Sequence, residues 1–337
     1  MEGYKFIDRL LHRLALGIPW ISEMAFDIEK LTINSKVIKP QAFYVTGLAR
    51  SGTTMLMRAL YSTDSFASLT YNDMPFVLSP NIWGKLTAFH SKSKISIERA
   101  HGDGIKVSFD SPEAFEEVFW KLHCGDDYIN QDVLKVHNVN KQVLSELHKY
   151  HELICHKYSK TKYLSKNNNF MLRIESVSKQ DPGITFLVMF RNPIDQAMSL
   201  LNQHKRFDNS DIFTKDYMNW LAHHEFGDTH KPFQFGNNTY NDSINEIDYW
   251  LRRWIDAYAF LLNLLQANKS NIIPICYETL CSDPIYWHTL CKKLSLSKID
   301  APFRLNNKVA DLSASDSLVK ESLSLYNEIN SFSKKIF

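Results

Sequence analysis

The segment Phe43–Thr54, FYVTGLARSGTT, runs from an apolar stretch into a turn with two glycines, one arginine and several hydroxyl residues. A strand, a glycine turn and a helix in this order can hold an anion, because the first backbone N–H groups of the helix and its dipole favour negative charge. Gly47 and Gly52 keep side chains out of that site, with four residues between them. This spacing, directly after a predicted strand, predicts a phosphate-binding loop.

The loop lacks the lysine that nucleotide triphosphatases carry directly after the second glycine. Thr53 stands at that position, and the cation of this loop is Arg50. The missing lysine argues against hydrolysis of ATP or GTP, because that side chain reaches the outer phosphates. We expect the anion to be held by Arg50, Ser51, Gly52, Thr53 and Thr54.

A second pair of residues, Arg191 and Ser199, also has the chemistry to bind phosphate. Arg191 directly follows the apolar run TFLVMF, which predicts a buried strand, and Ser199 lies eight residues later on a predicted helix. A guanidinium offers two parallel N–H donors to a phosphate, and the serine hydroxyl adds another. The sequence therefore holds two candidate phosphate sites, each after a strand.

These motifs resemble those of sulfotransferases that use 3′-phosphoadenosine 5′-phosphosulfate (PAPS). GLARSGTT is similar to the family's 5′-phosphosulfate loop, and Arg191 with Ser199 matches the pair that binds the 3′-phosphate. ATP has no 3′-phosphate, so the second motif favours PAPS. The resemblance covers about positions 40–290 and points to the branch with tyrosylprotein sulfotransferases and their bacterial relatives. Ala49 and Asn192 depart from the common Pro and Asp, without removing a phosphate contact.

The resemblance implies transfer of a sulfuryl group from PAPS to a hydroxyl or amine by in-line displacement. Such a reaction is similar to phosphoryl transfer and depends on positioning and positive charge. The acceptor also needs a base. Asp73, in TYNDMPF, falls near the acidic base of this branch and is the first candidate, with Glu113 the second. His101 and His123 are also candidates but lack a supporting motif.

Positive charge for the leaving phosphate is expected from Arg50 and the loop amides. Lys166 follows the predicted strand TKYLSK, at the position of a lysine in the resembled branch, and is expected to help electrostatically. Lys308 is a further candidate, for contact with the phosphate on the adenine side of the cofactor. We predict no metal site, because sulfuryl transfer needs none.

Strands and helices are predicted to alternate along the chain. This pattern favours a P-loop-like three-layer α/β/α fold with a central, mostly parallel sheet, and ligands at the carboxyl ends of its strands. Pro274 argues against a central place for the last strand. Predicted strands are 41–47, 161–166, 183–192 and 271–280, and predicted helices are 53–62, 111–122, 140–159, 170–179, 193–204 and 246–268. We expect one domain over 1–337, with a helical lead-in over 1–38.

Composition excludes several classes of protein. The 337 residues are 44% hydrophobic, enough for a large core, and the formal net charge of +2 argues against nucleic acid as a partner. The five scattered cysteines form no CxxC pair, which is typical of reduced thiols. No apolar stretch reaches the ~20 residues of a transmembrane helix. We expect a cytoplasmic protein.

The segment 205–245 is aromatic, polar and weakly periodic, and we predict an irregular loop on the acceptor side of the site. Its aromatic residues suit a saccharide or a small ring-bearing alcohol as acceptor. Two alternatives remain at this point. One is a P-loop nucleotide or small-molecule kinase, and the other is a non-catalytic protein that binds the desulfated cofactor, 3′-phosphoadenosine 5′-phosphate (PAP).

Overall fold

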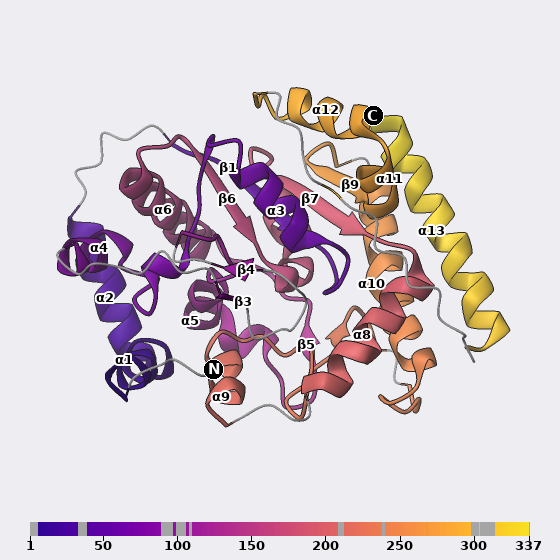
Figure 1. Ribbon diagram of the computed structural model, residues 1–337, viewed down its shortest axis with the longest axis horizontal. Helices are drawn as coiled ribbons and strands as arrows, with labels where there is room; N and C mark the ends of the chain where they lie inside the picture. Colours follow the sequence, from indigo (N-terminus) through magenta and orange to yellow (C-terminus); the bar gives the residue numbers. More distant parts are fainter. Residues whose placement is uncertain are drawn as a thin grey trace.

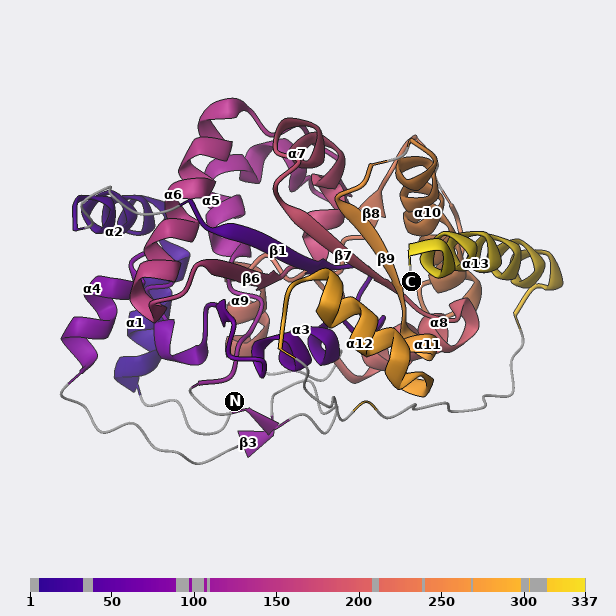
Figure 2. The ribbon, with the colours of Figure 1, turned by 90° about the horizontal axis from the view of Figure 1, so that it is seen from above.

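In the computed structural model, a central sheet lies between two layers of helices (Figures 1 and 2). The sheet has five parallel strands in the order β2 (Phe66–Ala67), β6 (Lys162–Lys166), β1 (Gln41–Thr46), β7 (Thr185–Phe190) and β9 (Ile272–Cys276). The structure describes residues 6–32, 39–88, 97–98, 106–107, 110–207, 212–237, 240–267, 269–297, 303 and 314–336. The predicted three-layer α/β fold is confirmed.

Helices cover both faces of the sheet. Figure 2 shows α3 (Thr53–Tyr61), α11 (Tyr277–Ser282) and α12 (Pro284–Lys293) on one face. The opposite face is covered by α5 (Glu117–Tyr128), α6 (Lys141–Tyr158), α7 (Ile174–Gln180) and α10 (Ile247–Gln266). Beyond β9, α13 (Asp316–Ile336) packs on α10 and on the edge of the sheet, near α8 (Pro193–Phe207).

The remaining elements lie around this frame. The helices α1 (Phe6–Gly17) and α2 (Pro19–Leu31) pack on each other, and α2 also contacts α4 (Pro80–Thr87), α5 and α6, while α1 contacts α9 (Ile212–Trp220). Two-stranded pairs are formed by β3 (Ile97–Glu98) with β4 (Lys106–Val107) and by β5 (Leu134–Lys135) with β8 (Phe233–Gln234). Short 3₁₀ turns span Tyr71–Asp73 and Asn168–Leu172.

Alternate residues of the central strands pack on opposite faces. Val45 and Leu187 belong to the apolar cluster under α3, whereas Tyr44 and Phe186 belong to the cluster on the α5 and α6 side. Because both faces are covered, these strands are continuous apolar runs. The register sets Val45 beside both Leu187 and Lys166, so the chain leaves β1, β6 and β7 at one edge of the sheet.

Three local predictions need correction. The helix predicted from Ser111 begins only at Glu117, because residues 111–113 pair with residues 69–71: the backbone N–H of Glu113 donates to Leu69 O (3.2 Å) and Tyr71 N–H to Ser111 O (3.3 Å). The segment 170–179 is a 3₁₀ turn followed by α7. The strand predicted over 271–280 ends at Cys276 and continues as α11. That strand does lie at the edge of the sheet, as Pro274 predicted.

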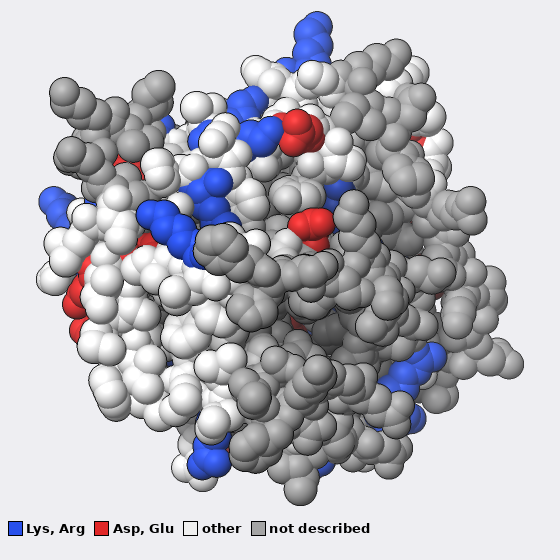
Figure 3. Space-filling model, turned by 60° about the vertical axis from the view of Figure 1, so that its left-hand side comes forward, with Lys and Arg blue, Asp and Glu red and all other residues white. Residues whose placement is uncertain are grey.

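The segment 205–245 is less irregular than expected. It contains the end of α8, the whole of α9 and the short strand β8. Among the described residues, no helix combines the length and apolar character needed to cross a membrane. On the face drawn in Figure 3, several Lys and Arg side chains of the described residues gather in the upper left part, with Asp or Glu side chains nearby, and others stand singly.

Candidate active site

The loop between β1 and α3, which we call the phosphate loop (47–54), has a backbone that only particular residues allow. Gly47 and Gly52 have φ angles of 136° and 98°, and Arg50 has a φ of 67°. A Cβ atom on Gly47 would lie 2.4 Å from the carbonyl oxygen of Met189, and one on Gly52 would lie 2.7 Å from the Tyr277 ring. Both glycines are therefore required by the turn itself.

The phosphate loop is also held from outside. Gln196, on α8, donates its side-chain N–H to the carbonyl oxygens of Ala49 (2.9 Å) and Leu48 (3.4 Å). The indole of Trp254 donates to Gln196 Oε1 (3.0 Å), which fixes the orientation of the amide. Because Gln196 and Trp254 are fully buried, the loop is anchored to two helices that are far from it in the sequence.

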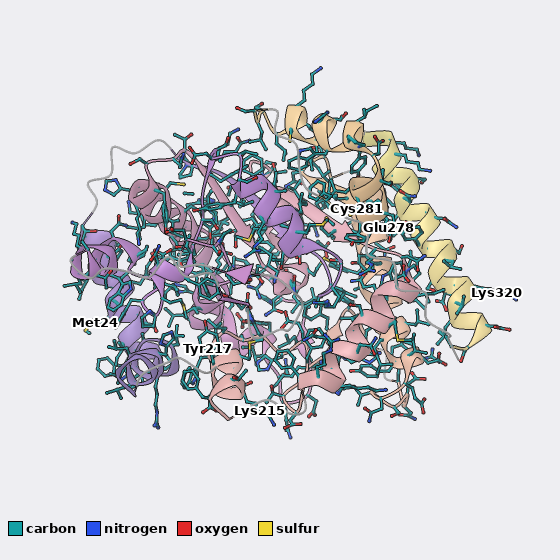
Figure 4. All side chains as sticks on the ribbon, in the orientation of Figure 1. Met24, Lys215, Tyr217, Glu278, Cys281 and Lys320 are labelled. Atoms are coloured by element: carbon teal, nitrogen blue, oxygen red, sulfur yellow. The ribbon has the colours of Figure 1, made fainter. Side chains whose placement is uncertain are left out.

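A cavity of about 240 Å³ opens beside this loop. Its cationic side consists of residues 49–55 without the buried Ser51, together with Lys166, Asn168, Arg191 and Tyr277. Its aromatic side consists of Tyr71, Glu113, Phe115 and residues of the segment 217–226. Figure 4 shows Tyr217 on α9 and Glu278 on α11, with the chain that leads into α3 between them in this view.

Three cations of the cationic side come from three neighbouring strands. Arg50 follows β1, Lys166 ends β6, and Arg191 follows β7. The guanidinium of Arg191 lies 4.7 Å from the centre of the Tyr277 ring, and Glu278 accepts a hydrogen bond from the backbone N–H of Asn192 (2.9 Å). The carboxyl edge of the sheet therefore concentrates positive charge, as the sequence predicted.

The two predicted phosphate sites touch each other. Arg50 Nε donates a hydrogen bond to Ser199 Oγ at 3.0 Å, joining the phosphate loop to α8. Ser199 itself does not line the cavity, and it reaches the cavity through Arg50. Ser51 is fully buried and is likewise absent from the lining. Thr53 and Thr54 line the cavity.

Asp73, the first candidate base, lies inside the protein. Its carboxylate accepts hydrogen bonds from the backbone N–H of Thr70 (2.7 Å) and the hydroxyl of Tyr158 (2.7 Å), and it pairs with Lys157. With Thr70 it forms a capping box around the turn Tyr71–Asp73. Asp73 has no exposed surface and does not line the cavity. The carboxylate of Asp73 therefore stabilises the turn and is not placed to contact a ligand in the cavity.

Glu113, the second candidate, does line the cavity. Its Oε1 accepts a hydrogen bond from the backbone N–H of Ala114 at 3.1 Å. His223, on the opposite segment, hydrogen-bonds through Nε2 to the carbonyl oxygen of Ala114 at 3.1 Å. This bond joins the two segments of the aromatic side. His123 does not line the cavity, and His101 and Lys308 lie outside the described residues.

A chain of side chains crosses the cavity from the cationic to the aromatic side. Thr53 Oγ1 donates to Asn168 Oδ1 (3.4 Å), and Asn168 Nδ2 donates to Glu225 Oε1 (3.1 Å). Burial alone would raise the pKa of the Glu225 carboxyl, but the nearby charges of His223 and Lys166 outweigh burial, and the pKa lies below its usual range. Glu225 is therefore an ionised carboxylate at neutral pH.

Two neighbouring carboxylates behind the site have opposite environments. Glu117 pairs with Arg173 (2.9 Å), which lowers its pKa despite burial, and accepts a hydrogen bond from Asn167 (2.6 Å). Glu116 has neutral partners, Tyr163 (2.5 Å) and Trp120 (2.7 Å), and burial raises its pKa to about 7. Through Asn167, the buried ion pair fixes the start of the turn that follows Lys166.

Sequence reasoning missed Asn168, His223, Glu225 and Tyr277. Asn168 lies two residues after β6 and Tyr277 directly after β9, so the rule that ligands lie at carboxyl ends of strands could have singled them out. His223 and Glu225 carry no such signal, because their segment reaches the cavity only through the tertiary fold. Among the described residues, no group of three or more His, Cys, Asp or Glu side chains is arranged to hold a metal ion.

A model of the sulfotransferase family matches residues 42–298, from β1 to the end of the α12 region. The chain belongs to the sulfotransferase family. The resemblance that the two motifs suggested is therefore confirmed at the level of the family, and the chain is a transferase.

Solved structures with a similar chain path include two bacterial sulfotransferases. The sulfotransferase STF1 from Mycobacterium tuberculosis H37Rv is 14% identical, with 98% of this chain and 85% of that chain covered and a TM-score of 0.47. A sulfotransferase from Alicyclobacillus acidocaldarius is 12% identical, with 89% of this chain and 96% of that chain covered and a TM-score of 0.43. No curated protein sequence matches this sulfotransferase. The family match carries the assignment.

Proposed function

We propose that this sulfotransferase transfers the sulfuryl group of PAPS to a hydroxyl group of a small acceptor. One observation carries this proposal. The phosphate loop after β1 and Arg191 after β7 line the same cavity at one edge of the sheet, and Arg50 joins the loop to Ser199. A nucleotide with phosphates at both its 5′ and 3′ positions has the two anionic groups that such a site can bind.

The residues present fit PAPS. Gly52, Thr53 and Thr54 line the cavity at the start of α3, where backbone N–H groups favour an anion such as a phosphosulfate. We assign the 5′-phosphosulfate to Arg50, Gly52, Thr53, Thr54 and the backbone of Ser51. PAPS supplies an activated sulfuryl group with a phosphate as leaving group.

We assign the 3′-phosphate to Arg191 and to Ser199, whose hydroxyl is held by Arg50. The guanidinium is already held against the Tyr277 ring at 4.7 Å, so its fork is oriented by its neighbours. A kinase would instead want a lysine at Thr53 and a magnesium-binding acid after a second strand, and Arg191 follows β7 in place of such an acid. The kinase alternative is therefore the weaker one.

We propose Glu113 as the base that takes the proton of the acceptor hydroxyl. It lines the cavity, whereas Asp73 is buried among Thr70, Tyr158 and Lys157. Lys166 lines the cavity with only 9% of its surface exposed, so its charge is poorly screened by water. We assign it to stabilise negative charge that develops on the transferred group or on the leaving phosphate.

Calorimetric titration with PAP and with ATP tests the assignment. We expect PAP to bind without magnesium, and Arg191→Ala to weaken binding about 10- to 100-fold, as the loss of one or two charge-assisted hydrogen bonds would do. Arg206→Ala is the matched control, because Arg206 lies in the last turn of α8, the helix that follows Arg191, and does not line the cavity. If ATP binds more tightly than PAP, and only with magnesium, the kinase alternative would be favoured instead.

A second measurement distinguishes an active sulfotransferase from the other alternative, a non-catalytic protein that binds PAP. A protein that binds PAP but releases no PAP from PAPS in the presence of any hydroxyl acceptor belongs to that class. We expect PAP release to depend on the acceptor, and to fall in Glu113→Gln while PAP affinity stays unchanged.

A further inference from the structure

The aromatic side of the cavity combines apolar surface with negative charge. Phe115, Leu221 and Phe226 supply the apolar wall, and Glu113 and Glu225 supply two carboxyl groups. We propose that the acceptor is a hydroxyl compound with an apolar, ring-sized body and no negative charge, and that Glu225 is the residue that excludes anionic acceptors. This inference rests on the proposed function of the same site.

The apolar wall is rigid. Phe115 is 1% exposed and packs edge-on against the Tyr71 ring, with ring centres 5.1 Å apart. Phe226 packs against Phe207 with ring centres 5.9 Å apart, and Leu221 is 2% exposed. Because these side chains are already held in place, a ring can pack against the part of each that lines the cavity at little entropic cost. They offer few hydrogen bonds to the many hydroxyl groups of a sugar.

The position of Glu225 is fixed from the cationic side. Asn168 donates to its Oε1 at 3.1 Å, and Asn168 in turn accepts from Thr53 at the start of α3. The carboxylate therefore lies where the phosphate loop meets the aromatic side. An acceptor bound between the phosphate loop and the aromatic side would therefore lie near this carboxylate.

The charge of Glu225 needs a reason beyond nucleotide binding. A site that only had to hold a polyanionic donor would gain affinity by having no carboxylate in its lining, since like charges repel across a partly desolvated cavity. Lys166 lowers the pKa of the Glu225 carboxyl, so the carboxylate stays ionised in the lining at a cost to an anionic donor. Rejection of anionic acceptors is a benefit that offsets this cost, because specificity often rests on a repulsive element.

These groups would select between anionic and uncharged acceptors. An anionic acceptor meets Glu225, Glu113 and the phosphates of the donor, which all repel it. An uncharged alcohol or phenol meets no such repulsion and buries its ring against Phe115 and Phe226. Acidic or already sulfated saccharides are therefore excluded, and the earlier expectation of a saccharide acceptor narrows to an apolar hydroxyl compound.

Binding of matched probes to the PAP-bound protein tests the inference without relying on turnover. The probes are 2-naphthol, its anionic analogue 6-hydroxy-2-naphthoate, and methyl β-glucoside, each titrated by calorimetry. We expect 2-naphthol to bind most tightly and the naphthoate at least about tenfold more weakly, because like charges in one site oppose binding. A naphthoate that binds as well as 2-naphthol, a glucoside that binds more tightly, or no binding of either naphthyl compound would overturn the inference.

Two variants assign the effect to Glu225. In Glu225→Gln the amide oxygen still accepts from Asn168, so we expect the gap between the two naphthyl compounds to shrink more than about threefold. Asp228→Asn is the matched control, since it removes the same charge from the same segment outside the cavity, and its gap should stay as in the wild type. An unchanged gap in Glu225→Gln would contradict the role of this residue.

The outcome separates this inference from the proposed function. If PAP does not bind, the proposed function fails, and the same probes titrated into the nucleotide-free protein still report the charge preference. If PAP binds and the naphthoate is preferred, only the acceptor inference fails. The wild-type comparison needs no variant, so it decides the charge preference even where Glu225→Gln is unstable.

Discussion

The two sides of the cavity are built in different ways. The cationic side comes directly from strand ends, so the register of β1, β6 and β7 fixes where Arg50, Lys166 and Arg191 lie. The aromatic side comes from the segments 110–116 and 217–226, which are joined by the bond between His223 and Ala114. A rigid frame therefore holds the charges, and loops supply the surface that selects a partner.

The largest expected effect separates Glu113, which lines the aromatic side, from the buried Asp73. Glu113→Gln removes the proposed base and should lower kcat about 10²- to 10⁴-fold, the usual worth of a general base, with PAP affinity unchanged. Asp73→Asn should leave kcat within a few-fold and lower the thermal unfolding temperature, because it weakens a capping box and a buried ion pair. The opposite pattern would return the catalytic role to Asp73.

The next effect is the pH dependence of stability that comes from Glu116, a buried residue next to the segment that forms the aromatic side. Glu116 keeps its proton up to about pH 7 in the folded protein, whereas the unfolded chain releases it near pH 4.5. The folded state therefore binds more protons between these values, and stability falls as the pH rises through them, by on the order of 3 kcal/mol from this group. Above pH 7 both states are ionised, and the loss is complete.

Chemical denaturation from pH 4.5 to 8, on the wild type and on Glu116→Gln, measures this contribution. As the pH rises to about 7, the wild type should lose stability relative to Glu116→Gln. The unfolding free energy of the variant minus that of the wild type should therefore become more positive. Glu117→Gln is the contrasting variant. Its carboxylate is stabilised by Arg173, so its loss should destabilise the protein most above the ordinary pKa of a glutamate. A flat difference for Glu116→Gln would contradict the raised pKa.

A smaller effect tests the frame of the cationic side. Gly47→Ala places a Cβ atom 2.4 Å from the Met189 carbonyl oxygen at a φ of 136°, which should cost about 1–3 kcal/mol of stability and abolish tight PAP binding. In the control, Gly236→Ala, the new Cβ atom meets no atom within 4 Å, and we expect a change within about 0.5 kcal/mol. Equal effects of the two variants would show that the turn tolerates side chains.

The smallest effect concerns the orientation of Arg191. Tyr277→Leu removes the ring under the guanidinium and should weaken PAP binding about three- to thirtyfold, the range of one cation–π contact. Tyr277→Phe keeps the ring and should bind PAP as the wild type does. Binding of 2-naphthol should stay unchanged in both, since Tyr277 belongs to the cationic side. A loss of naphthol binding would show that the two sides are not separable in this way.

The cationic side could be predicted from the sequence because its residues follow apolar runs along the chain. The strand before Gly47 and the strand before Arg191 were both evident, and parallel pairing brings their ends together. The segment 205–245 was expected on the acceptor side, but which of its residues line the cavity could not be predicted in this way. Glu225 and Tyr217 lie far along the chain from Glu113, and only tertiary packing sets them opposite one another.

Local signals also failed where long-range pairing was stronger. Ser111 and Pro112 have the features of a helix start, yet the bridge between Thr70 and Pro112 holds them in an extended arrangement. Asp73 was placed by an approximate match to a family pattern, and only the coordinates show that Tyr158 and Lys157 surround its carboxylate. In both cases the deciding partners come from a distant part of the sequence.

The hydrogen bond from Arg50 to Ser199 has a consequence for the length of the nucleotide. It connects the start of α3 with the second turn of α8, and so sets the spacing between two helix starts from separate strand–helix units. A bisphosphate whose ends match this spacing needs little movement of either helix. Under the proposed function, this contact between two side chains therefore holds the two phosphate sites at a fixed separation before the nucleotide binds.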